Sequence, residues 1–259
     1  MTDITPQRIH VSVGIEGNTK QSYLSDLGNI YGTEHVLVYQ LPSKKFIRLS
    51  ELPLKPSQSL LKMGKDLLGN TPLFNQSQPN NNDRDNSNGQ TYARNNLPSD
   101  TAVVHGLFKP SIFKGIFENP FISIILRDPL ERMISLYETW KTNKGTVDWR
   151  VTIPFNNKLP FPKFAFQESF MNFQSKCLGS RRLGDFDLVG VAECQAGFIA
   201  QLKNKDWTGY VNPKETTIQL NKPRYKTLGI TAEFLEEFML QNEKDYSIYH
   251  QAKEFIGYC

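Results

Sequence analysis

The chain has 259 residues, and its 30 Lys and Arg against 26 Asp and Glu give a formal net charge of +4. Such a length accommodates one large domain or two small ones, and either buries a sizeable core. The charge is too evenly balanced for the dense basic face of a typical nucleic-acid-binding protein, so we expect no nucleic-acid partner. It is compatible with an anionic ligand held at one site.

Cysteines and histidines are scarce, with three and four residues respectively. The cysteines form no CxxC pair and the histidines show no HExxH or other paired spacing, so we expect neither a disulfide framework nor a metal. No run approaches the roughly 18 apolar residues of a membrane span, and the first residues lack the pattern of a signal peptide. The sequence thus predicts a soluble, cytoplasmic protein with reduced cysteines and no membrane partner, and it leaves the oligomeric state open.

Strand and helix signals alternate in the first part of the chain. Residues 8–13 are short, β-branched and alternating, which predicts a strand. A glycine-containing turn over 14–19 and a helical pattern over 20–27 follow, and this order opens many phosphate-binding α/β folds. A second strand is predicted over 34–39, and a short helix over 57–68.

The composition changes over residues 75–100, which contain eight Asn with Gln, Ser, Asp and Gly. A segment with so few large apolar residues cannot bury enough surface to order itself. We therefore expect a disordered loop inside the domain, with a functional lid as the alternative interpretation.

The next two strands and a helix are the clearest elements of the sequence. Residues 101–106 predict a strand that ends in a glycine turn, and residues 121–126 form the apolar run of a central strand covered on both faces. Asp128 then supplies a good N-cap, and Pro129 occupies the favoured first helical position. Apolar residues recur at steps of three and four as far as Trp140, which predicts a helix.

The C-terminal part repeats the alternation. A buried strand is predicted over 186–192, followed by helices around 198–202, from Thr231 onward and over 245–252. Strands that alternate with helices indicate a three-layer, P-loop-like α/β fold in which helices flank a central parallel sheet. We expect a single domain over residues 1–259.

Arg127 and Ser135 form the first candidate site. Arg127 leaves the central strand at its carboxyl end, where α/β proteins place ligands, and Ser135 lies about two turns along the next helix. A guanidinium fork and a hydroxyl at these positions suit one phosphate group. The alternative is an arginine paired with a carboxylate on a surface turn.

Residues 126–140, LRDPLERMISLYETW, resemble the 3′-phosphate-binding segment of sulfotransferases that use 3′-phosphoadenosine 5′-phosphosulfate (PAPS). The likeness is to the carbohydrate branch of that family, including the heparan sulfate 2-O-sulfotransferases, and it places Arg127 and Ser135 on the 3′-phosphate. Segments 104–106, 186–193 and 242–249 resemble further parts of that branch in order and spacing. The resemblance implies a PAPS-dependent O-sulfotransferase that uses no metal.

The resemblance weakens at the loop expected to hold the 5′-phosphosulfate. The family has a Pro-Lys-Thr-Gly-Gly type of loop after its first strand, whereas this chain has GIEGNTK over 14–20. One interpretation is that Gly17, Asn18 and Thr19 cradle the 5′-phosphate and Lys20 supplies the cation, because glycine turns before a helix bind anions. The other is that the loop has decayed and binds nucleotide weakly or not at all.

Two residues are candidates for the catalytic base. In the family the last position of an HGH-type segment often supplies a histidine, but Leu107 occupies it here. His105 remains, and the ordinary pKa of histidine suits proton abstraction near neutral pH. Glu16 is the alternative base, and a packing role is the alternative for His105.

A basic segment and a group of aromatic residues complete the expectations. Lys222 and Arg224 are candidates for the loop that closes over the 3′-phosphate and adenine, with Tyr225 stacking on adenine, or else they form a solvated basic turn. Aromatic residues between Trp140 and Phe173 either line the acceptor pocket or belong to the core.

The expected acceptor is a small hydroxylated molecule of secondary metabolism, because the chain shows no N-terminal anchor of the kind found in animal glycan-modifying relatives. A bacterial glycan is the alternative acceptor, and a non-catalytic nucleotide-binding protein is the alternative function. A P-loop kinase or NTPase would share the architecture, but no GxxxxGK[ST] motif occurs.

Overall fold

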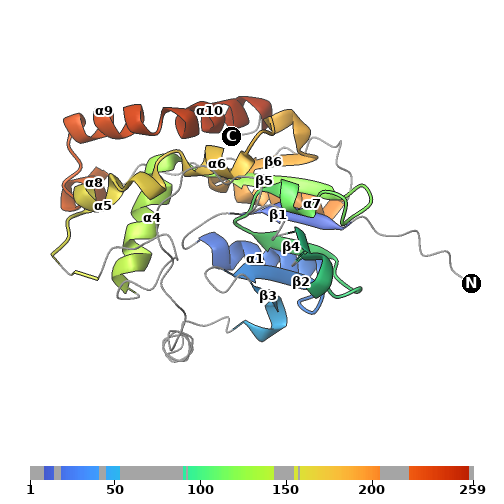
Figure 1. Cartoon of the computed structure of the whole chain (residues 1–259). Coiled ribbons are helices and arrows are strands. Elements are labelled where there is room, and N and C mark those ends of the chain that lie inside the picture. The colour runs from blue at the N-terminus through green and yellow to red at the C-terminus, as the bar shows by residue number, and fades with distance from the viewer. Residues whose placement is uncertain are drawn as a thin grey trace, which may run out of the picture.

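The computed structural model is an α/β protein built around one six-stranded sheet (Figure 1). It describes residues 9–14, 19–40, 45–52, 90–91, 93–142, 155–156, 158–204 and 222–256. The strands are β1 (His10–Val13), β2 (Val36–Gln40), β3 (Lys45–Arg48), β4 (Val103–Gly106), β5 (Phe121–Leu126) and β6 (Leu188–Val191). The helices are α1 (Thr19–Tyr31), α4 (Pro129–Thr142), α5 (Phe161–Ala165), α6 (Phe173–Leu178), α7 (Gln195–Asn204), α8 (Lys222–Thr227), α9 (Ala232–Gln241) and α10 (Glu243–Ile256).

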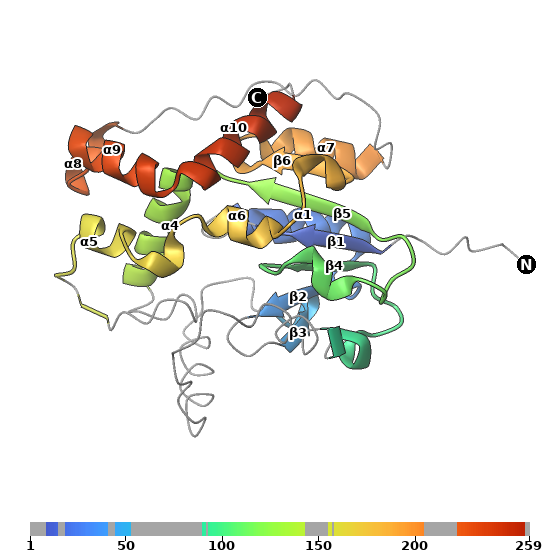
Figure 2. The same ribbon diagram turned by 45° about the horizontal axis from the view of Figure 1, so that its top comes forward.

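The sheet has the order β3-β2-β4-β1-β5-β6, which Figure 2 shows from its lower to its upper edge. The pairs β2–β4, β4–β1, β1–β5 and β5–β6 are parallel, whereas β3 is antiparallel to β2. The predicted strands are therefore confirmed, but β3 was not foreseen. Its sequence, KFIR, is too short for period-two alternation to distinguish it from a loop.

Helices cover both faces of the sheet, so the expected three layers are present. Alternate residues of β5 face opposite ways, because successive side chains of a strand point to opposite faces. Ile122, Ile124 and Leu126 join a core cluster that includes residues of α6 and α10. Phe121 and Ile125 join a second cluster with α1 and α7. Figure 2 shows α6 and α10 in front of the sheet and α1 and α7 behind it.

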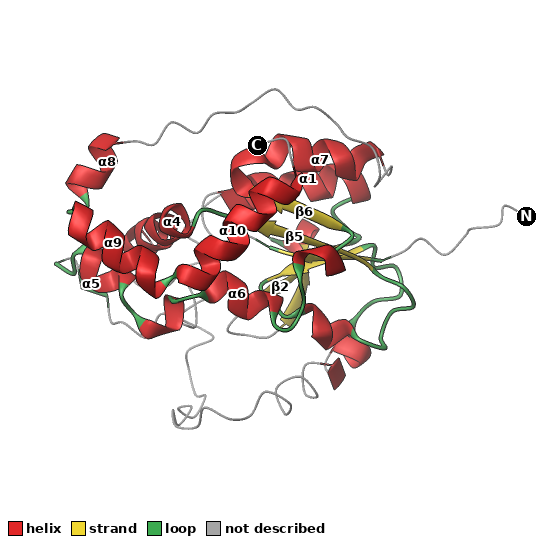
Figure 3. Cartoon of the chain, turned by 90° about the horizontal axis from the view of Figure 1, so that it is seen from above, coloured by secondary structure: helices red, strands yellow, loops and turns green. Residues whose placement is uncertain are grey.

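A third cluster of aromatic and aliphatic side chains lies beside the sheet, where α4, α5 and α9 pack together (Figure 3). Phe161, Phe164 and Phe170 are buried in it: Phe161 packs on Tyr137, Phe164 packs on Trp140, and Phe170 packs on Phe164. These three aromatic residues are therefore core. Trp149, which belonged to the same expectation, lies outside the described residues.

The start of α4 follows the pattern expected from its sequence. The Asp128 carboxylate accepts hydrogen bonds from the backbone N–H groups of Leu130 and Glu131, at 2.9 and 3.0 Å. These bonds satisfy donors that the first helical turn leaves without partners. The cap fixes the direction in which α4 leaves β5.

Some expectations fall partly or wholly outside the description. The helix predicted over 57–68 is outside it, as are residues 75–89 of the Asn-rich segment. The end of that segment differs from the expectation, because residues 93–96 are helical and Ala93 is fully buried in the core. The few apolar residues of this polar segment gave no periodic signal of this packing.

Two further observations bear on the cysteines and on membranes. Cys177 is a reduced thiol, whereas Cys194 is disulfide-bonded, contrary to the expectation of reduced cysteines. Within the described part of the chain, no helix combines the length and the apolar character needed to cross a bilayer.

Candidate functional site

The carboxyl ends of β1, β4 and β5 lie next to one another at the middle of the sheet. The helix that follows β1, α1, packs on one face, while the connections after β4 and β5 bring Phe113 and Leu178 to the other face. In open α/β sheets, ligands bind outside the carboxyl ends of strands at such a topological switch point. The fold alone therefore makes this edge of the sheet the candidate ligand site.

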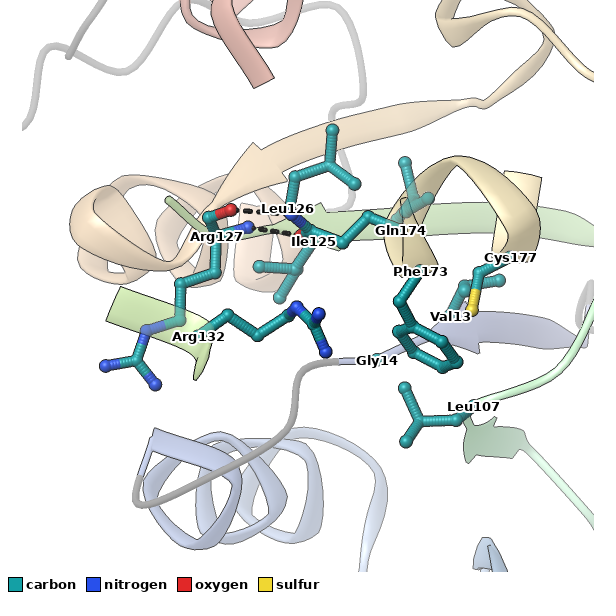
Figure 4. Close-up of a pocket in the computed structure, with 11 residues that line it drawn as sticks. Val13, Gly14, Leu107, Ile125, Leu126, Arg127, Arg132, Phe173, Gln174 and Cys177 are labelled. Carbon is teal, nitrogen blue, oxygen red and sulfur yellow. Dashed lines mark hydrogen bonds between the residues drawn. The ribbon is translucent and has the colours of Figure 1, made fainter. Parts of the chain in front are cut away.

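A hollow opens at this edge, with a volume of about 330 Å³ counted out to its open mouth. We call it the arginine hollow because two arginines stand in its wall (Figure 4). Its lining residues are Val13, Gly14, Leu107, Ile124, Ile125, Leu126, Arg127, Arg132, Phe173, Gln174 and Cys177. None of these described lining residues is acidic.

Arg127 is fixed through its backbone by Gln174 of α6. The Gln174 side chain accepts from the Arg127 N–H and donates to the Arg127 carbonyl, both at 2.8 Å. Burial lowers the pKa of the Arg127 guanidinium, and the charges of Glu193 and Glu131 act in the opposite direction. An arginine retains its charge under such conditions, so Arg127 brings a positive charge to the strand end.

Ser135 lies on α4, two turns beyond Arg127 in sequence, and is 1% exposed. Its carbonyl accepts a hydrogen bond from the Thr139 hydroxyl at 2.8 Å. Arg127 and Ser135 thus come from the strand end and the helix predicted for them. Only Arg127 of the two lines the hollow.

Arg132, which the sequence did not single out, also lines the hollow. It is 3% exposed, its Nη2 donates to the Phe170 carbonyl at 2.9 Å, and its guanidinium carbon lies 5.1 Å from the centre of the Phe173 ring. Figure 4 shows its guanidinium pointing toward Phe173 and Gly14, whereas that of Arg127 points away from them. The signal was present as the second arginine of RDPLER, one helical turn after the N-cap.

His105 lies on the other face of the sheet and is not among the residues that line the hollow. Its Nδ1 is 3.1 Å from the Ser12 hydroxyl, and its ring packs on Tyr23 at 5.1 Å between centroids. A Cβ added to Gly14 would lie 2.0 Å from its Cε1. The His105 ring therefore occupies the space directly beneath Gly14.

His105 belongs to a buried polar network in the middle of the sheet, which we define as His10, Ser12, Tyr23, His105 and Ser123. The register aligns Ser12 with both His105 and Ser123 in neighbouring strands. The Ser12 and Tyr23 oxygens are 2.8 Å apart, Tyr23 also bonds to Ser123, and His10 Nε2 lies 2.6 Å from the Ser123 hydroxyl. Polar residues at alternate positions of otherwise apolar strands were the signal for this network.

The candidate phosphate loop adjoins the hollow in sequence. Gly14 lines the hollow, and α1 begins at Thr19. Glu16, Gly17 and Asn18, together with the side chains of Thr19 and Lys20, lie outside the described residues. Their predicted roles, and that of Glu16 as the alternative base, stay predictions.

Arg224 and Tyr225 lie on α8, not in the expected loop or turn, and both contact α4. The Arg224 guanidinium pairs with Glu131 at 3.3 Å and with Glu138 at 2.5 Å, and the Tyr225 hydroxyl donates to Glu131 at 2.9 Å. Arg224, which was predicted to bind the 3′-phosphate, is therefore paired with two carboxylates of α4 instead. The Lys222 side chain lies outside the described residues.

Residues 242–249, which have the pattern NxxDxxxY, contact the elements that position Arg127. Asp245 is fully buried and accepts from the backbone N–H groups of Gln174 and Ser175, at 3.0 and 2.8 Å. Tyr249 hydrogen-bonds to Glu193, which in turn accepts from the Asp128 N–H at 3.1 Å. The segment thus holds α6, and through Gln174 the backbone of Arg127.

No family model matches the chain, and no curated protein matches it. The assignment of function therefore rests on the motif in residues 126–140 and on where the fold places it.

Proposed function

We propose that this protein is a PAPS-dependent O-sulfotransferase with a P-loop-like nucleotide site, which transfers a sulfuryl group to a hydroxyl of a small molecule. One observation carries the proposal: Arg127, from the segment that resembles the 3′-phosphate-binding motif, stands at the topological switch point. It lies beside the β1 end that leads into the candidate phosphate loop.

The strand ends supply the charge that a doubly phosphorylated nucleotide needs. Arg127 offers a guanidinium on a backbone that the Gln174 side chain holds in place, and guanidinium forks bind phosphate in a bidentate manner. In this scheme Ser135 adds a hydroxyl to the 3′-phosphate from α4. The β1–α1 turn offers backbone N–H groups at the start of a helix, which favour anions.

In the proposed reaction, a base removes the proton of the acceptor hydroxyl and the oxygen attacks sulfur in line. The bond from sulfur to the bridging oxygen breaks, and adenosine 3′,5′-bisphosphate leaves. Negative charge grows on the bridging oxygen, so a nearby cation lowers the barrier, as in phosphoryl transfer. Lys20 is the candidate cation, and Glu16 and His105 are the candidate bases. Of these two, His105 would need to become accessible from its buried network.

Calorimetric titration with adenosine 3′,5′-bisphosphate and with ATP tests the nucleotide site. We expect the bisphosphate to bind more tightly than ATP, and Arg127→Ala to weaken it about 10- to 100-fold, because a charge-assisted contact is lost. Lys141→Ala, which removes an exposed cation from the end of α4, is the matched control and should leave the affinity unchanged. Equal affinity of Arg127→Ala and wild type would remove Arg127 from the site.

Turnover separates the enzyme from a non-catalytic nucleotide-binding protein. The chain is mixed with PAPS carrying labelled sulfur and with a panel of small alcohols and phenols. Label in an organic product supports the transferase. Bisphosphate binding without transfer to any acceptor would favour the binding protein, which the altered phosphate loop also fits.

A further inference from the structure

The wall of the arginine hollow offers a ligand few polar groups other than its two arginines. Gln174 is the remaining polar side chain, and its amide oxygen and nitrogen are both bonded to the backbone of Arg127. The other lining side chains are aliphatic or aromatic, apart from the thiol of Cys177. A sugar presents hydroxyls on every side, and this wall would leave most of them without partners, at a cost in binding free energy.

Arg132 is held in place before any ligand arrives. Its guanidinium bonds to the Phe170 carbonyl and lies over the Phe173 ring, and it is aimed into the hollow (Figure 4). A group that is already fixed loses little conformational entropy on binding. Guanidinium groups recognise carboxylate and other planar or tetrahedral anions with paired hydrogen bonds.

The rest of the hollow suits a compact apolar body. Val13, Leu107, Phe173 and Cys177 surround the space in front of Arg132. The hollow is open at its mouth and its wall is mostly aliphatic and aromatic, which favours an apolar ring lying against it over a chain of sugars.

We propose that the arginine hollow binds an acceptor with a ring-sized apolar body and an anionic group, and that Arg132 binds the anionic group. That the bound molecule accepts a sulfuryl group rests on the proposed transferase function, whereas the binding of such an anion does not. Arg127 serves the nucleotide and Arg132 serves the second substrate, so one motif supplies both substrates with a cation.

Two probes of equal size separate charge from shape: 4-hydroxybenzoate and its neutral analogue 4-hydroxybenzamide. Their affinities are measured by calorimetry with and without saturating adenosine 3′,5′-bisphosphate. We expect the benzoate to bind at least about tenfold more tightly than the benzamide, since only the benzoate gains a charge-assisted pair. Equal binding of the two probes, or binding of neither, would overturn the proposal.

Arg132→Gln should abolish this preference and leave the affinity for the bisphosphate unchanged. Arg94→Gln, at an exposed arginine that does not line the hollow, is the control and should keep the preference. A preference that survives Arg132→Gln would overturn the role of Arg132. If Arg132→Gln instead weakens the bisphosphate as Arg127→Ala does, Arg132 belongs to the nucleotide site and the inference fails while the proposed function stands.

A measurement on the unaltered protein covers the case in which Arg132→Gln does not fold. Cys177 carries a reduced, partly exposed thiol in the wall of the hollow, so a bound ligand should shield that thiol. Alkylation of Cys177 by N-ethylmaleimide, followed by mass spectrometry, should be slowed by the benzoate and much less by the benzamide. Equal rates with both would count against the proposal. Protection by the benzoate in a protein that binds no bisphosphate would refute the proposed function and leave the anion site.

Discussion

The two faces of the sheet differ sharply at the carboxyl end of β1. On the face under α1, polar side chains form a closed network in which every member is at most 1% exposed. On the face under α6, the strand side chain Val13 is apolar, and the charge comes from Arg132 on a helix and points into an open hollow. Gly14 adjoins both, because it lines the hollow and lies against the His105 ring.

This difference separates two uses of polar residues. Buried groups that hydrogen-bond to one another favour one arrangement of the strands, because breaking such a bond in the interior costs free energy. A charged group fixed beside an open hollow is in position to bind a ligand. We therefore expect the first face, which includes His105, to stabilise the fold, and we propose the second face as the one that binds a ligand.

The largest effect is expected where the two faces meet. In Gly14→Ala the new methyl group would lie 2.0 Å from His105 Cε1 and 2.5 Å from Nε2, so the ring must leave its place between Ser12 and Tyr23. We expect a loss of about 3 kcal/mol in the free energy of unfolding, measured by urea denaturation. Gly184→Ala, where nothing lies within 4 Å of the added Cβ, is the control.

A double mutant shows whether His105 is the cause. If the overlap with the ring destabilises Gly14→Ala, adding His105→Ala should cost less than the sum of the two single substitutions. Strict additivity of the unfolding free energies would mean that Gly14 and His105 are not energetically coupled, and so that Gly14 does not connect the two faces of the sheet.

The next effect is a pH dependence from the closed face. Burial lowers the pKa of His10 to about 3, against 6.5 in the unfolded chain, and its Nδ1 has no hydrogen-bond partner among the described residues. Between these values the unfolded state binds one more proton than the folded state, so stability falls as the pH falls. The slope from this residue is about 1.4 kcal/mol per pH unit between pH 6 and pH 4.

Urea denaturation at several pH values, for wild type and His10→Asn, isolates this contribution. Burial raises the pKa of Asp128 and of Glu193, which gives the opposite slope at acidic pH, so only the difference between the two proteins is informative. His10→Asn should lose the slope, while His250→Asn at an exposed position should retain it. Parallel curves for wild type and His10→Asn would show that His10 titrates normally.

The smallest effect concerns one hydroxyl of the network. Tyr23→Phe removes the group 2.8 Å from Ser12 and leaves His105 as a neighbour of that serine. We expect a loss of about 1 kcal/mol in unfolding free energy and no change in bisphosphate affinity. Tyr31→Phe on the same helix is the matched comparison and should cost less. A large loss of nucleotide binding in Tyr23→Phe would connect the closed face to the ligand site.

Much of the fold was predictable because its signals are local. The apolar run of β5, the Asp128 cap and the three-to-four spacing of α4 each depend on neighbouring residues, and the structure confirms all three. The edge strand β3 and the burial of Ala93 depend on distant partners, and the sequence missed both.

The candidate site divides in the same way. Arg127 was predictable from its position at the end of an apolar strand. The pairing of Arg224 with Glu131 and Glu138 spans about 90 residues, and no pattern within either segment predicts it. Arg132 was hidden for a related reason, since a helical arginine is ordinarily exposed and only the packing of Phe170 and Phe173 turns it inward.

The sequence by itself determined five of the six described strands, the capped helix after β5, and an arginine at the strand end. Periodicity and capping act over a few residues and can be read in one dimension. Only the tertiary structure decided that the His105 side chain joins a buried polar network, that Arg224 pairs with carboxylates, and that Arg132 faces the hollow. Each of these outcomes depends on which side chains the parallel strand register and the helix packing bring together across the chain.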